Sequence, residues 1–121
     1  MSTKLTYRAV SHCVDAILRR QGNFTAAQRP DLNDEVADLA IVRGVGAAAG
    51  RPAEVWDITS PDQMSIIRLI EVLPDRDIVV QLLRMHESKW IDMGSMTFRG
   101  ALAAPLHVAE AANSIAKAWI S

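Results

Sequence analysis

Apolar residues near the start of the chain recur at the spacing of an amphipathic helix. Charged residues such as Arg8, Asp15 and Arg19 occupy the opposite face, as on a helix that covers a core. Gly22 and Asn23 follow, and residues of these types commonly end helices. The pattern predicts a helix over residues 5–21, with a buried face made of Val10, Cys13, Val14, Ile17 and Leu18.

Residues 60–87 are rich in isoleucine, leucine and valine, and we expect the rest of the chain to be organised around them. Ser60 suits a helix N-cap, a proline follows it, and Gln63 can complete a capping box. A strand over residues 64–73 would place a charge in the middle of each face, at Arg68 and at Glu71. A helix is therefore predicted, with a polar stripe at spacing three that comprises Asp62, Ser65, Arg68 and Glu71.

The second apolar run, after Pro74 and Asp75, is ambiguous. Its polar residues are spaced as on a helix, whereas the β-branched triplet at residues 78–80 favours a strand. Pro74 interrupts any helix that reaches it. We predict an αα-hairpin, and the alternative is a β-hairpin that turns on residues 74–77. The polar stripe of the second run comprises Asp77, Gln81, Arg84 and Ser88.

The remaining segments complete a predicted chain of about five helices. We expect a loop over residues 24–30, a helix over residues 31–43, a flexible connection at residues 44–50 and a short strand or helical turn at residues 53–59. A short hairpin or irregular loop is expected over residues 89–100. A final helix begins at Pro105, and its apolar face holds Val108, Ala112, Ile115 and Trp119.

These elements predict a predominantly α fold, a compact domain of about five helices with a small β element near residues 89–99. The alternative is an α+β fold in which residues 64–98 form an antiparallel three-stranded meander covered by the terminal helices. At 121 residues, the chain is expected to form one domain over residues 1–121.

Composition and charge narrow the classes of function. Thirteen basic and fourteen acidic residues give a formal charge of −1, so we expect no nucleic-acid partner. No apolar run is long enough to cross a bilayer and no signal peptide is evident, so we expect no membrane association. The single cysteine, Cys13, fits a reducing compartment, and the predicted localisation is cytoplasmic.

Two sets of residues suggest catalysis or metal binding, and each has a simpler explanation. His12 and Cys13 are adjacent, but neighbouring helical residues point about 100° apart, so they do not form a nucleophile and base. Two pairs, His12 with Asp15 and His107 with Glu110, share the i,i+3 spacing of helical metal ligands. Such pairs are common, so we predict no catalytic residue and no metal site.

The glycines Gly44, Gly46 and Gly50 loosely resemble a phosphate-binding loop, but the preceding segment is predicted to be helical rather than a strand. We therefore expect a plain connection and no cofactor. Clustered charges are interpreted as capping or solvated residues rather than as sites. The acidic cluster comprises Asp31, Asp34, Glu35 and Asp38, and the basic one comprises Arg8, Arg19 and Arg20.

Large apolar residues that are rich in methionine gather late in the chain and suggest a surface for a protein or peptide partner. The predicted partner-binding residues are Met85, Trp90, Met93, Met96 and Phe98. Our first hypothesis is a small non-enzymatic interaction or accessory protein, with a homodimer as a further option. The alternative is a small-ligand or metal-dependent enzyme that uses the histidine–carboxylate pairs or the loop at residues 44–50.

Overall fold

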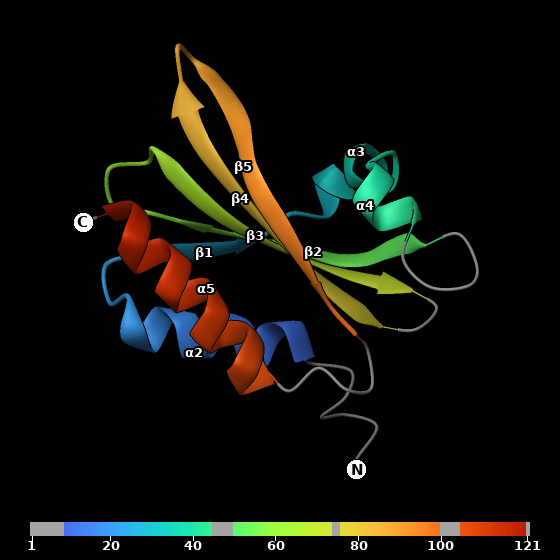
Figure 1. The fold of residues 1–121 in the computed structure, drawn as a ribbon, viewed down its shortest axis with the longest axis horizontal. Coiled ribbons are helices and arrows are strands. Elements are labelled where there is room, and N and C mark those ends of the chain that lie inside the picture. Colours follow the sequence, from blue (N-terminus) through green and yellow to red (C-terminus); the bar gives the residue numbers. More distant parts are fainter. Residues whose placement is uncertain (1–8, 45–49, 74–75, 100–104, 121) are drawn as a thin grey trace.

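A twisted five-stranded antiparallel sheet lies at the centre of the protein (Figure 1). The computed structural model describes residues 9–44, 50–73, 76–99 and 105–120. Each strand pairs with its neighbours in sequence, so the spatial order is β1-β2-β3-β4-β5. The strands are β1 (Thr25–Gln28), β2 (Arg51–Thr59), β3 (Ser65–Leu73), β4 (Asp77–His86) and β5 (Lys89–Phe98).

Helices cover the two faces of the sheet unequally. The long helices α2 (Ala9–Arg20) and α5 (Pro105–Ile120) pack side by side on one face (Figure 1). The opposite face carries three short helical segments near β2, and no other helix of the described residues covers that face. These segments are the 3-10 helix η1 (Pro30–Leu32) and the helices α3 (Asn33–Ala37) and α4 (Ala40–Arg43).

Alternation along β3 sends apolar side chains to both faces, which creates two cores. Ile67 and Leu69 point toward α2 and α5, whereas Ile70 and Val72 point toward α3 and α4. The larger core includes Val10, Cys13, Val14, Ile17, Ile58, Ile78, Val80, Leu82, Val108, Ala109 and Ala112. The smaller core adds Leu32, Val36, Val42, Val55 and Val79.

The predicted predominantly α fold is wrong, because residues 65–73 form a strand and not a helix. The prediction assumed that a charge cannot occupy the middle of a sheet face. Arg68 does so because the neighbouring strand supplies Asp57 as its counter-ion, and Glu71 is buried on the other face. Ser60, predicted as an N-cap, belongs to the turn before β3, where its Oγ accepts a hydrogen bond from the Ser65 amide at 3.1 Å.

The predicted αα-hairpin is also wrong. Residues 77–86 form β4, as the β-branched triplet favoured, while residues 74–75 lie outside the described part of the chain. Residues 89–98 form a full strand, β5, rather than a small hairpin or loop. The alternative of a three-stranded meander over residues 64–98 comes closer, but it omits β1 and β2 and the short helices on the second face.

The helices at the two ends of the chain are confirmed, with α2 ending just before Gly22 and α5 beginning at Pro105. Side chains predicted to be buried on α2, such as Cys13 and Ile17, are fully buried. The predicted loop at residues 24–30 contains β1, and the predicted helix at residues 31–43 is divided into η1, α3 and α4. Residues 53–59 belong to the longer strand β2.

Candidate functional site

Exposed large apolar side chains gather at one end of the sheet. Among the described residues they are Met64, Trp90, Ile91 and Met93, with exposed fractions of 44%, 39%, 41% and 54%. Met64 precedes β3, and the other three belong to the first half of β5. Surface apolar residues scattered singly need no explanation, but a contiguous group commonly marks an interaction site.

The strand register aligns three of the large apolar side chains across the sheet. The Met85 amide donates a hydrogen bond to the Met64 carbonyl at 2.8 Å, and Met85 pairs with Trp90 across β4 and β5. This hydrogen bond extends the register of β3 with β4 by one pair, so Met64 lies beside Met85 on the face opposite α2 and α5. We call Met64, Met85 and Trp90 the Met–Trp row.

Two buried residues of the same sheet face lie next to the Met–Trp row. Ile66 and Leu83 pair with each other across β3 and β4, and their exposed fractions are 6% and 5%. Met64 lies two residues before Ile66, and Met85, the partner of Trp90, lies two residues after Leu83. The row therefore continues into an apolar floor rather than standing alone.

A band of hydrogen-bonded polar side chains crosses the same face beyond this floor. Arg68 donates two hydrogen bonds to Asp57, from Nε at 2.7 Å and from Nη2 at 3.0 Å, and Arg29 adds a third at 3.3 Å. Gln81 Nε2 donates to Asp92 at 2.9 Å. We call Arg29, Asp57, Arg68, Gln81 and Asp92 the polar belt.

Most of the polar belt is held together by charge-assisted hydrogen bonds. The Asp57 side chain is only 3% exposed, and its two oxygens accept hydrogen bonds from Arg68 and Arg29, as a buried polar group requires. Arg29 also pairs with Asp31 at 2.8 Å, and that hydrogen bond raises the Arg29 pKa and lowers the Asp31 pKa. The belt separates the open apolar end of the face from the end covered by α3 and α4.

The projecting β4–β5 hairpin carries basic side chains on its other face. His86 pairs with Lys89, and Arg84 pairs with Ile91, so these residues alternate with the Met–Trp row along the two strands. Arg84, His86 and Lys89 are all exposed. The hairpin extends beyond the other strands (Figure 1), so both of its faces are accessible near the turn.

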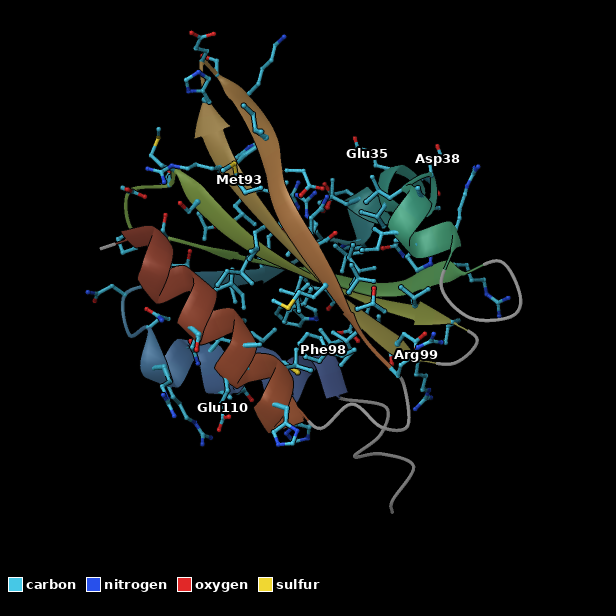
Figure 2. All side chains as sticks on the ribbon, viewed as in Figure 1. Glu35, Asp38, Met93, Phe98, Arg99 and Glu110 are labelled. Carbon is cyan, nitrogen blue, oxygen red and sulfur yellow. The ribbon has the colours of Figure 1, made fainter. Side chains whose placement is uncertain are left out.

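The five residues predicted to bind a partner do not form one surface. Met85 and Trp90 share the Met–Trp row, and Met93 is exposed at an irregularity of β5. Phe98 lies at the far end of β5 beside α5 (Figure 2) and packs against the larger core. Met96 is half-buried and shares the face of Phe98. Sequence reasoning omitted Met64, whose place in the row follows only from strand register.

Cys13 cannot serve as a nucleophile in this environment. Its side chain is fully buried in the larger core, and burial raises the pKa of its thiol to about 12. His12, by contrast, is exposed on α2. The thiol therefore stays protonated and shielded, in agreement with the predicted structural role.

The described residues contain no group of three or more histidine, cysteine, aspartate or glutamate side chains that could hold a metal ion. His12 and His107 are exposed on the neighbouring helices α2 and α5. The predicted acidic cluster is divided by ion pairs, since Asp31 pairs with Arg29 and Asp38 with Arg43, both at 2.8 Å.

Gly50, the last glycine of the suggested phosphate loop, has a packing role. A Cβ atom at this position would lie 2.0 Å from the Val42 carbonyl oxygen and 2.7 Å from Val72. The glycine therefore allows the backbone to pass close to α4 and β3. The rest of that loop, residues 45–49, lies outside the described part of the chain.

A separate surface hollow of about 450 Å³ lies where α2 ends and β2 turns into β3. Arg20 and Asp62 face it, while Arg8 lies outside the described residues. Hydrogen bonds from Ser60 Oγ and the Met64 amide lower the Asp62 pKa. The Asp62 carboxylate therefore binds groups of the β2–β3 turn itself. The other lining residues are Gln21, Gly22, Asn23, Phe24, Ser60 and Pro61.

Comparison of the chain with protein-family models, with curated protein sequences and with solved structures finds no match. No helix within the described residues is long and apolar enough to cross a membrane. The site is therefore interpreted from its own geometry.

Proposed function

We propose that the protein is a non-enzymatic interaction module that binds an apolar segment of a partner protein on the Met–Trp row. One observation carries the proposal: Met64 and Trp90, two of the exposed large apolar side chains of the described residues, flank Met85 at one end of the sheet. A hot spot in a protein interface has this composition, with an aromatic anchor among adaptable side chains.

The surroundings of the row define the kind of segment that fits. Ile66 and Leu83 provide an apolar floor, and the polar belt borders it, with Arg68 bound to Asp57 and Gln81 Nε2 bound to Asp92. An apolar side chain on the floor needs no hydrogen-bond partner from it, and the side chains of Ile66 and Leu83 offer none to a buried charge. The partner segment is therefore apolar at its centre and polar where it reaches Arg68 and Asp92.

The test is selection of binders from a random library of twelve-residue peptides with the purified protein, followed by affinity measurements on synthetic peptides. The selected peptides should be rich in apolar residues. Trp90→Ala should weaken their binding at least about 30-fold, the effect of losing roughly 2 kcal/mol at a hot spot. Met64→Ala should weaken it less, because methionine contributes less buried area.

Lys89→Ala is the matched control, because Lys89 adjoins Trp90 in sequence but points to the opposite face of the hairpin. Its affinity for the selected peptides should equal that of the unaltered protein. The proposal fails if no peptide is enriched, or if the enriched peptides bind equally well to the Trp90→Ala protein.

A further inference from the structure

The outer edge of β5 is a long, accessible hydrogen-bonding surface. β5 has ten residues, pairs with β4 on one side and forms the edge of the sheet on the other. The opposite edge strand, β1, has only four residues. An edge strand presents a row of unpaired N–H and C=O groups that can pair with another strand. The first seven residues of β5 are all exposed, so no described part of the chain covers this edge.

An irregularity in β5 changes which residues share a face. The register with β4 shifts between Leu82 and Leu83, so that Met93 is an extra residue in β5. On the face of α2 and α5 lie Lys89 and Ile91 before the shift, and Met96 and Phe98 after it. The opposite face holds Trp90, Asp92, Ser95 and Thr97.

This shift makes β5 complementary to a second copy of itself. In an antiparallel pair that uses all ten residues, Lys89 is opposite Phe98 and Trp90 is opposite Thr97. Each of these pairs consists of two residues from the same face, as a continuous sheet requires. In a regular strand the same pairing would combine residues from opposite faces. The remaining pairs are Ile91 with Met96, Asp92 with Ser95 and Met93 with Gly94.

The direction of the backbone groups agrees with this pairing. Glu87 and Ser88 have φ angles of 50° and 66° and form a two-residue turn, so Lys89 directs its backbone toward β4. Trp90 therefore directs its N–H and C=O groups outward. Thr97 lies on the same face as Trp90, so its N–H and C=O groups also point outward. Along a strand, the direction of the backbone groups alternates between the two edges with the same period as the side chains alternate between the two faces.

The charges at the ends of the pair are complementary. Lys89 and Asp92 are the charged residues of β5, and neither faces a like charge in this register. Arg99, which follows β5, would lie opposite Ser88 of the second copy and next to Glu87 in the same turn. Arg99 lies at the end of β5 away from the turn (Figure 2), so this contact forms at both ends of the strand pair.

We propose that two copies of the protein join through β5 to form one continuous ten-stranded sheet, with a two-fold axis between Met93 and Gly94. The apolar pair of Ile91 with Met96 lies on one face, and Trp90 with Thr97 on the other. The two Met–Trp rows then face the same side of the joined sheet, near opposite ends of the strand pair. Such a dimer would present two partner-binding surfaces together.

The first test compares Thr97→Pro with Thr97→Ala by sedimentation equilibrium over a concentration series. The unaltered protein and Thr97→Ala should reach twice the chain mass. Thr97→Pro should remain at the chain mass, because proline removes an outward N–H and its ring blocks the approaching strand. The pairing with β4 should survive. A monomeric unaltered protein at every concentration, or a dimeric Thr97→Pro protein, would overturn the proposal.

A charge exchange provides a second test that does not alter the backbone. Arg99→Glu and Glu87→Arg should each weaken dimerisation, and the double variant should restore it. Equal dissociation constants for all four proteins, or a double variant weaker than either single one, would contradict the register. Binding of the selected peptides to the monomeric variant tests the Met–Trp row separately, so either proposal can fail alone.

Discussion

The two ends of one sheet face differ although the same strands form both. At one end Val55, Ile70 and Val79 lie under α3 and α4 and are fully buried. At the other end Met64 and Trp90 remain exposed. The polar belt lies between them. The difference shows that the strands supply apolar residues along their whole length, and that the position of the short helices decides which of them become core.

The largest predicted effect comes from the belt that divides the two ends. Asp57→Asn removes the counter-ion of Arg68, whose side chain is only 15% exposed, and leaves that buried charge without an opposite charge. Breaking a buried pair in this way costs about 3–5 kcal/mol of unfolding free energy. Urea denaturation should measure the loss.

Asp38→Asn is the control, because Asp38 forms an exposed ion pair with Arg43. It should change stability by less than about 1 kcal/mol. Equal effects of Asp57→Asn and Asp38→Asn would show that the belt does not hold the face together.

The second-largest expected effect comes from truncating an apolar side chain at the covered end of the face, compared with the same kind of change at the open end. Ile70→Ala, under α3 and α4, should lower the unfolding free energy by about 2–5 kcal/mol, because it leaves a cavity in a packed core. Met64→Ala, at the open end, should lower it by no more than about 0.5 kcal/mol. A similar loss at both sites, measured by urea denaturation, would mean that the Met–Trp row is part of the core.

The smallest expected effect concerns Glu71, whose carboxylate lies on the sheet face that α2 and α5 cover. Burial raises the pKa of Glu71 above its usual value of 4.5, and Arg76 offsets this only in part. The folded state therefore binds a proton at Glu71 more readily than the unfolded state does. The contribution of Glu71 to the unfolding free energy consequently falls as the pH rises above 4.5.

Glu71→Gln should raise the unfolding free energy at pH 7, and the gain should shrink toward zero as the pH falls below 4.5. Thermal unfolding at several pH values measures it. Glu54→Gln should give a smaller gain, because the charge of Glu54 also raises the Glu71 pKa but less than burial does. A gain for Glu71→Gln that does not change with pH would mean that burial of the charge is not its cause.

Local periodicity was sufficient for the terminal helices and insufficient for the sheet. Val10, Cys13 and Ile17 recur at helical spacing, and each is buried as that spacing predicts. Arg68 and Glu71 looked incompatible with a strand because their compensation is not local: the partner of Arg68 lies on β2. The β-branched residues at 78–80 indicate the strand correctly, whereas the helical spacing of the polar residues around them favours the wrong element.

The candidate site could be foreseen only in part for the same reason. Trp90 and Met85 were identified from composition, whereas Phe98 and Met96 were assigned to the same surface although β5 turns them to the other face. Met64 reaches the row only through the register of β3 with β4. A residue list cannot contain this information, since a shift of one position in register reverses every face.

Residue types and their spacing were enough to predict the two amphipathic helices, because helix formation depends on neighbours along the chain. Composition was enough to show that the chain has sufficient apolar residues for a core. Contacts between distant segments decided the rest: which charge Asp57 neutralises, which apolar residues α3 and α4 cover, and which remain on the surface. Pairing between strands is non-local, so the folded protein alone determines where Met64 meets Trp90.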